Sequence, residues 1–132
     1  MNREFINPPD MAAPASNLYS HVVKVGNTVY ISGQVPRSVD GKPAHVGDAE
    51  AQMHLVWANL ERAVNAAGGS LKDIVKTTVY VVGTESLPKI RRARLALLPA
   101  EGRPTSTMVV VAALADPDFL VEVEAIAVLG GD

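Results

Sequence analysis

Hydrophobic and polar residues alternate along two stretches in the first third of the chain, and this alternation predicts β-strands. The first stretch covers residues 18–25 (LYSHVVKV) and the second covers residues 28–35 (TVYISGQV). Gly26-Asn27 supplies the residue types of a tight turn between them, so we expect a hairpin. Gly33 interrupts the second strand pattern and indicates a bulge or a close approach to the backbone.

The segments on either side of this hairpin lack the alternation. Residues 1–17 are rich in proline, alanine and polar side chains, which predicts an irregular lead-in. Residues 36–47 are predicted to form a loop, and a helical period follows Asp48, which we expect to be the N-cap. Gly68-Gly69 ends this helix. Its apolar stripe consists of Met53, Val56, Trp57, Leu60, Val64 and Ala67, so core packing is the expected role of the single tryptophan.

A second helix is predicted over residues 86–98 (SLPKIRRARLALL), with Ser86 or Thr84 as its N-cap. Its apolar stripe consists of Leu87, Ile90, Ala93 and Leu97. Three further strands are predicted, at residues 73–83, 102–115 and 120–129, and the apolar run at 102–115 is expected to be buried for most of its length.

The resulting order β-β-α-β-α-β-β predicts one α+β domain over residues 1–132. We expect a two-layer sandwich in which both helices cover one face of a mixed sheet. The opposite face of the sheet then needs a cover of its own, and a partner subunit is the expected one.

Composition narrows the classes of function. The net charge of −2 gives no electrostatic footprint for nucleic acid, and no basic helix indicates binding to a membrane. The chain has no cysteine, which excludes disulfides, a thiolate nucleophile and a cysteine–zinc site. The first residues carry no secretory signal and no stretch has the length of a membrane span, so we expect a cytoplasmic protein.

Two glutamates alternate with apolar residues in the last predicted strand. Glu122 and Glu124 share the face opposite to Val121, Val123 and Ala125. A solvated outer face is the simpler interpretation. However, the strand carries no lysine or arginine to balance the pair, and its flanks are strongly apolar. These features favour a carboxylate at an interface, where it acts as a general base or positions a water.

Arg91 and Arg94 lie three residues apart on the second predicted helix, near one face of it. They form either a solvated surface or a guanidinium fork for a carboxylate or phosphate. The three histidines, His21, His45 and His54, show no ligand spacing, so we predict no metal and no cofactor. By pattern alone, the chain is a small α+β domain that associates into an oligomer.

Several segments together resemble the RidA/YjgF family of reactive-intermediate (enamine/imine) deaminases, also described as endoribonuclease L-PSP. They are YISGQVP, NLERAVNAAGGSLKDIVKTTVYV and ADPDFLVEVEAIAV, and in this order they cover nearly the whole chain. The resemblance implies a chorismate-mutase-like fold and a homotrimer with ligand pockets between subunits. It also implies hydrolysis of a 2-imino or 2-enamino acid to a 2-keto acid and ammonia, with an arginine that clamps the substrate carboxylate.

The resemblance assigns site residues at some positions. Tyr19 matches the family tyrosine before the first strand, while Ser32 and Gly33 match the serine and glycine of the pocket. Glu122 matches the glutamate that holds the attacking water, so we expect it to be the catalytic residue.

At the clamp, this sequence departs from the family pattern. The family arginine follows a proline by two positions, and here Ser106 occupies that place after Pro104. Thr107 and Met108, which takes a place often held by cysteine, complete the expected ligand-binding set on this strand. Arg91 stands where many members carry an asparagine. Arg91, together with Arg94, is the expected substitute cation, because the resemblance implies that the second helix borders the pocket.

We therefore expect a small polar ligand at a subunit interface and weak turnover of 2-imino acids, because Ser106 offers only a neutral hydrogen bond. An enamine or imine without a carboxylate is one expected substrate. Two alternatives stay open: a non-catalytic binding or sensing protein, and an endoribonuclease or translation inhibitor. Net acidity and few aromatic residues disfavour contact with RNA.

Overall fold

The computed structural model describes residues 2–130, which form one six-stranded sheet and a layer of helices. The strands are β1 (Arg3–Ile6), β2 (Val22–Val25), β3 (Thr28–Gln34), β4 (Ile74–Val82), β5 (Thr105–Val111) and β6 (Val121–Val128). The α-helices are α1 (Ala49–Ala66) and α2 (Leu87–Leu97), and the short 3₁₀ helices are η1 (Ala15–Asn17), η2 (Leu71–Asp73) and η3 (Thr84–Ser86).

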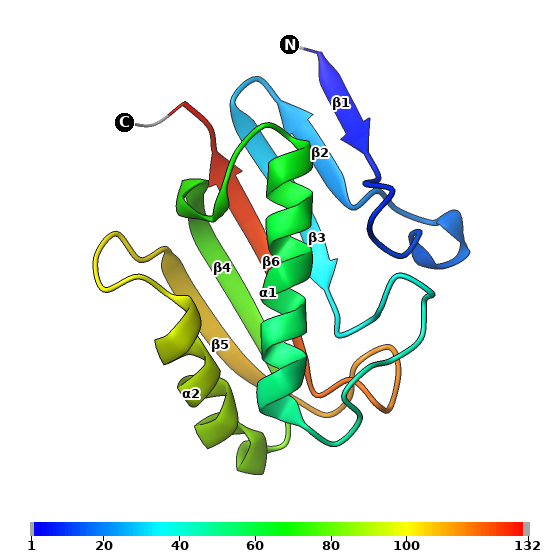
Figure 1. Ribbon diagram of the computed structural model, residues 1–132, viewed down its shortest axis with the longest axis vertical. Helices are drawn as coiled ribbons and strands as arrows, with labels where there is room; N and C mark the ends of the chain where they lie inside the picture. The colour runs from blue at the N-terminus through cyan, green and yellow to red at the C-terminus, as the bar shows by residue number, and fades with distance from the viewer. Residues whose placement is uncertain (1, 131–132) are drawn as a thin grey trace.

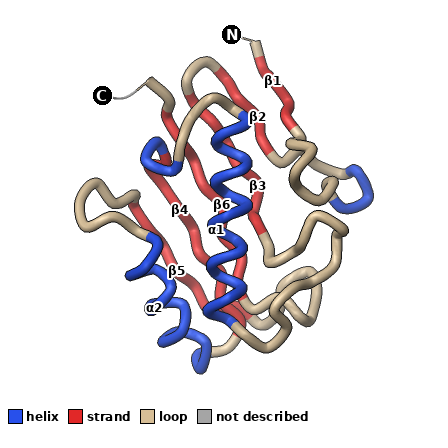
Figure 2. The backbone as a smooth tube through the Cα atoms, in the orientation of Figure 1, coloured by secondary structure: helices blue, strands red, loops and turns tan. Residues whose placement is uncertain are grey.

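The sheet is mixed, with the strand order β1-β2-β3-β6-β4-β5. All neighbours pair antiparallel except β4 and β5, which are parallel and are joined through α2. Both helices lie on one face of the sheet, with α1 across the central strands and α2 in front of β5 (Figure 1, Figure 2). The predicted α+β sandwich is therefore confirmed, with one strand more than the sequence indicated.

The additional strand is β1, which lies in the segment predicted to be irregular. It pairs antiparallel with β2, with Phe5 opposite Val23. As an edge strand it is held by its backbone, and its side chains stay largely exposed, so they do not need to alternate in polarity. The predicted strand 18–25 is shorter than expected, because pairing begins only at Val22.

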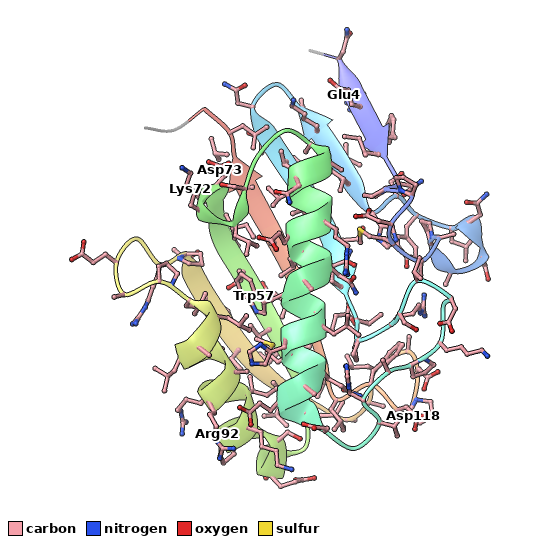
Figure 3. The ribbon with its side chains drawn as sticks, viewed as in Figure 1. Glu4, Trp57, Lys72, Asp73, Arg92 and Asp118 are labelled. Carbon is pink, nitrogen blue, oxygen red and sulfur yellow. The ribbon has the colours of Figure 1, made fainter. Side chains whose placement is uncertain are left out.

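The first helix follows its predicted pattern closely. The Asp48 carboxylate accepts a hydrogen bond from the Ala51 amide at 3.0 Å, which confirms the predicted N-cap. The predicted stripe residues are all buried, and Trp57 lies between α1 and the sheet (Figure 3). Burial of this stripe against the sheet holds the two layers together.

Removing this cap is expected to destabilise the protein without changing its fold. An Asp48→Ala variant leaves an amide of the first turn without its partner, and such losses cost about 1 kcal/mol. Urea unfolding followed by circular dichroism measures this difference. An Asp48→Asn variant keeps an acceptor at the same place and should lose much less; equal losses in both variants would contradict the capping role.

The second helix begins differently from the prediction. Ser86 occupies the N-cap position but makes no side-chain capping hydrogen bond, because η3 runs directly into α2. Pro88 lies in the first turn as expected. An ion pair of 3.0 Å between Arg92 and Glu50 ties α2 to the start of α1 (Figure 3).

The predicted strand 102–115 corresponds to the shorter β5, and the expectation that it is mostly buried is wrong for the single chain. β5 forms the edge of the sheet, so that Val109 and Val110 are 39% and 45% exposed. On the face away from the helices, Tyr30 and Val128 are exposed as well. This apolar exposure is consistent with the expected cover by a partner subunit.

Candidate functional site

Glu122 lies on β6 and faces away from the helices. Its neighbours Val121 and Val123 are fully buried in the core, and alternation along the strand places Glu122 on the opposite face, as predicted. Tyr80 of β4 lies directly across from it in the register of the two strands. The Glu122 side chain is half-buried on this face of the sheet.

The carboxylate of Glu122 rests against the backbone of β3 at Gly33. The pairing of β3 with β6 is irregular between Ile31 and Gln34, so the predicted bulge at Gly33 is present. A methyl group on Gly33 would overlap Glu122 Oε2 and lie 2.8 Å from its Cδ. Glycine is therefore the residue that lets the carboxylate lie here.

The environment of this carboxylate makes it a stronger base than an ordinary glutamate. Burial raises the pKa of Glu122, and the negative charge of Glu124 raises it further. Glu124 itself accepts a hydrogen bond of 2.7 Å from the Tyr80 hydroxyl. Within residues 2–130 no protein group donates a hydrogen bond to Glu122, so its oxygens are free to accept from a water molecule.

Because its pKa is raised, the charged form of Glu122 destabilises the folded state above acidic pH. The folded state binds the Glu122 proton more tightly than the unfolded state, so stability falls as the pH rises from the unfolded pKa to the folded pKa. We expect Glu122→Gln to raise the melting temperature of the protein near neutral pH, because it removes this titration. Below the ordinary glutamate pKa this gain should disappear.

Thermal unfolding across this pH range measures the effect. Glu101→Gln, which removes an exposed carboxylate, should show no such gain at any pH. A gain for Glu122→Gln that persists in acid would contradict the assignment to this titration.

Ser32 holds the bulged strand and does not offer a free hydroxyl. Its Oγ donates a hydrogen bond of 2.6 Å to the Ser20 carbonyl, and its amide donates one of 2.9 Å to the His21 carbonyl. The hydroxyl proton and the amide of Ser32 are thus both used within the chain, and Oγ can still accept a hydrogen bond. Ser32 lines a hollow of about 380 Å³ on the open face, together with Tyr30, Lys76 and Glu124.

The buried His21 contacts Gln34 at the end of β3 and Tyr19. The His21 ring is hydrogen-bonded through Nε2 to the Ala12 carbonyl at 2.6 Å and through Nδ1 to the Gln34 amide at 3.2 Å. Nε2 donates to the carbonyl, and Nδ1 accepts from the Gln34 amide. The half-exposed Tyr19 packs edge-on against this ring, with 5.8 Å between ring centres. His21 is thus structural, and it orients Tyr19.

Three further predicted site residues, Ser106, Thr107 and Met108, lie on β5, and they divide between its two faces. Ser106 pairs with the buried Thr77 and Met108 with the buried Val79, so both face the helix layer. Thr107 faces the opposite side. Met108 packs against the hydrophobic core and is only partly exposed.

Arg94, not Arg91, contacts Ser106, the strand position at which the sequence resemblance led us to expect an arginine. Its Nη2 donates a hydrogen bond of 2.8 Å to Ser106 Oγ. Arg91 is exposed on the helix surface. Helical geometry offers a signal for this difference: Arg94 lies about 40° around the helix from the buried Ile90, and Arg91 about 100°.

The predicted site residues therefore form two separate groups in one chain. Glu122, Gly33, Ser32 and Tyr19 lie around β3 and β6. Ser106 and Arg94 lie at the sheet edge, with β4 between β5 and β6, so the strands are about 10 Å apart. Ser106 faces the helices and Glu122 faces away from them, and the sheet lies between the two side chains.

A larger apolar hollow of about 860 Å³ lies elsewhere, between Trp57, Leu97 and Pro104, and contains none of the predicted site residues. Between residues 2 and 130, no three His, Cys, Asp or Glu side chains are grouped as ligands for a metal ion. Neither α-helix in that part of the chain has the length and apolar content needed to cross a membrane.

Comparison with known proteins places the chain in a family. Residues 10–129 match the family described as Endoribonuclease L-PSP. The chain is 33% identical over 127 residues to the 3-aminoacrylate deaminase RutC of Acinetobacter baylyi, covering 96% of this chain and 98% of that protein. It is 32% identical over 72 residues to a 2-iminobutanoate/2-iminopropanoate deaminase of Dermatophagoides farinae, covering 54% and 56% of the two chains.

Comparison with solved structures places the chain in the same family. The crystal structure of RidA from the Antarctic bacterium Psychrobacter sp. superposes with a TM-score of 0.87 at 33% identity, over 96% of this chain and 99% of that chain. The mixed sheet with both helices on one face agrees with the fold that the resemblance implied. The chain therefore belongs to the endoribonuclease L-PSP family, the RidA/YjgF family of enamine and imine deaminases.

Proposed function

We propose that this protein is a hydrolase of small imines and enamines, with Glu122 holding the attacking water. The observation that carries the proposal is the Glu122 carboxylate, which lies half-buried against Gly33 with its oxygens unused by protein donors among residues 2–130. Burial and Glu124 raise its pKa, as a general base requires. The deaminase names of its relatives support the reaction class.

The reaction follows from these groups. The imine reacts as its protonated form: Glu122 accepts a proton from water while the water oxygen bonds to the carbon of the C=NH₂⁺ group, which gives a neutral carbinolamine. Glu122 then gives this proton to the amine nitrogen. The carbon–nitrogen bond breaks as the C=O bond forms, the hydroxyl proton passes to Glu122 and from it to the departing ammonia, and Glu122 is again a carboxylate. Imine and water thus become a carbonyl compound and ammonia. An enamine enters the same route after protonation at its carbon.

The proposal includes a homotrimer with the ligand pocket between subunits. Glu122 and the residues around Gly33 supply one wall, and the start of the edge strand β5 of a neighbour, which carries Ser106 and Thr107, supplies the other. The sheet separates these groups within one chain, so they form one pocket only when two copies contribute. The exposed edge strand β5 is available for such a contact.

An assay of a freshly formed imine tests the proposed activity. An L-amino-acid oxidase with catalase generates 2-iminobutanoate from 2-aminobutanoate, and semicarbazide captures the imine that remains. The protein should slow semicarbazone formation and speed ammonia release in proportion to its concentration. An equal mass of an unrelated protein provides the control. Semicarbazone formation that does not respond to the protein would contradict the proposal.

Binding without turnover is the competing function, and the same samples separate it. A binding protein would take up a stable 2-keto acid in calorimetry while the imine assay stayed at its uncatalysed rate. The family description also names an endoribonuclease, but the net charge of −2 gives RNA little attraction.

A further inference from the structure

The apolar hollow of about 860 Å³ lies apart from the site around Glu122, which is not among its lining residues. Its walls come from α1, η2, the start of β4, the end of α2 and the loop that leads from α2 to β5. A volume of this size is typical of sites for small molecules, which span roughly 300–1,000 Å³. Most side chains around it are apolar, among them Trp57, Leu71, Ile74, Leu97, Leu98 and Pro104.

Trp57 brings an unpaired hydrogen-bond donor to this hollow. The residue lies between α1 and the sheet and is only 4% exposed (Figure 3). Among residues 2–130, no group accepts a hydrogen bond from its Nε1, although this nitrogen is buried. An indole nitrogen can only donate, and buried donors in folded proteins nearly always have an acceptor. The missing acceptor therefore points to a molecule that occupies the hollow.

The charged residues around the hollow disfavour an ionic ligand. Lys72 and Glu101 are exposed and keep their charges in water. The Asp73 carboxylate accepts a hydrogen bond of 2.8 Å from the Ser70 amide and so has a partner within the chain. An ionic ligand would lose its hydration against apolar walls without gaining a fully buried counter-ion. An uncharged molecule with an apolar body avoids this loss, and a single oxygen satisfies the indole.

We propose that this hollow binds a small uncharged molecule with an apolar body and one carbonyl or ether oxygen, and that this oxygen accepts the hydrogen bond from Trp57 Nε1. Burial of the apolar body against the side chains of α1, α2 and β4 supplies most of the affinity. The Nε1–H group selects for an acceptor, because a ligand without one leaves the indole unpaired. The site is independent of the proposed hydrolysis, since neither Glu122 nor Gly33 lines the hollow.

The indole N–H group itself reports on binding. Trp57 is the single tryptophan of the chain, so the isotope-labelled protein gives one indole nitrogen–proton resonance. Cyclohexanone and methylenecyclohexane are matched probes, because they share their ring and differ only in the exocyclic oxygen or CH₂ group. Cyclohexanone should shift the resonance to higher proton frequency in a saturable way, since an accepted hydrogen bond deshields the proton. Methylenecyclohexane should not shift it in this direction.

Two phenylalanine variants of α2 locate the binding. Ala96 lines the hollow, whereas the neighbouring Leu95 is 71% exposed and does not line it. Ala96→Phe places a ring at the hollow and should weaken cyclohexanone binding by about tenfold or more. Leu95→Phe adds the same ring outside the hollow and should leave binding unchanged. Both positions are exposed, so both variants should fold, which circular dichroism checks.

Trp57→Phe tests the hydrogen bond. It removes the donor and keeps an aromatic side chain, so calorimetry should show that the affinity ratio of cyclohexanone to methylenecyclohexane falls by about threefold to tenfold. Taking the ratio of the two probes cancels a change in the size of the hollow, which affects both alike. An unchanged ratio would overturn the proposal.

Two further results would also overturn it. One is an indole resonance that neither probe moves, because water alone or a neighbouring chain fills the hollow, or that both probes move alike. The other is cyclohexanone binding that Ala96→Phe and Leu95→Phe change equally. None of these measurements uses imine turnover, so failure of this proposal and failure of the proposed hydrolysis are separate results.

Discussion

Glutamine in place of Glu122 is expected to lower the rate of imine hydrolysis by about 10²–10⁴-fold while the protein remains folded. The amide keeps the shape of the side chain and its place against Gly33, but it cannot take a proton from water. The measurement is kcat/KM for 2-iminobutanoate, with circular dichroism and thermal unfolding of the same samples. A variant that keeps more than about a tenth of the wild-type rate would remove Glu122 from the mechanism.

The pH dependence distinguishes a base from a merely structural carboxylate. Because burial and Glu124 raise the pKa of Glu122, the acidic limb of kcat/KM should lie above the range of an ordinary glutamate. Glu124→Gln removes the neighbouring charge, so the limb should move to lower pH with little loss at its plateau. The residual rate of Glu122→Gln should show no such limb.

The second large effect is expected from Gly33→Ala. The added methyl group would overlap Glu122 Oε2 and lie 2.8 Å from Cδ, so the carboxylate has to leave its place on β3. A displaced general base reduces the rate steeply, and we expect a loss of about 10²-fold in kcat/KM. Crowding is also expected to cost about 1–3 kcal/mol of stability, which urea unfolding measures.

A double-mutant cycle separates displacement of Glu122 from general damage. If Gly33→Ala acts through the carboxylate, then adding it to Glu122→Gln should lower the residual rate by less than about threefold. A further loss of 10²-fold in that background would mean that the alanine disturbs something other than Glu122.

The sequence alone predicted the elements that bury one face, because their apolar side chains recur at a regular spacing. In α1 the apolar stripe, the Asp48 cap and the glycine stop all agree with the structure, because each depends on contacts within a few residues. The same holds for β6, where buried valines alternate with Glu122 and Glu124. The hairpin turn at Gly26-Asn27 and the bulge at Gly33 are local in the same sense.

The sequence did not predict the elements that are held mainly by backbone hydrogen bonds. β1 leaves its side chains in solvent, so its sequence carries no alternation, and only pairing with β2 shows that it is a strand. The residues 18–21 alternate like a strand, yet they turn away because the His21 amide and ring bind Asn7 and Ala12. β5 has a core-like composition, but its place at the sheet edge exposes it.

Some features of the candidate site could be predicted from the sequence, and others could not. Sequence patterns sufficed for Glu122 and Gly33, since alternation and a glycine inside a strand are read along one chain segment. They could not say which helical arginine serves β5, because Arg91 and Arg94 differ only in their angle to a strand that is distant in sequence. Nor could they show that the sheet separates Glu122 from Ser106. Such relations depend on how segments pack in space, and packing is set by contacts between residues far apart along the chain.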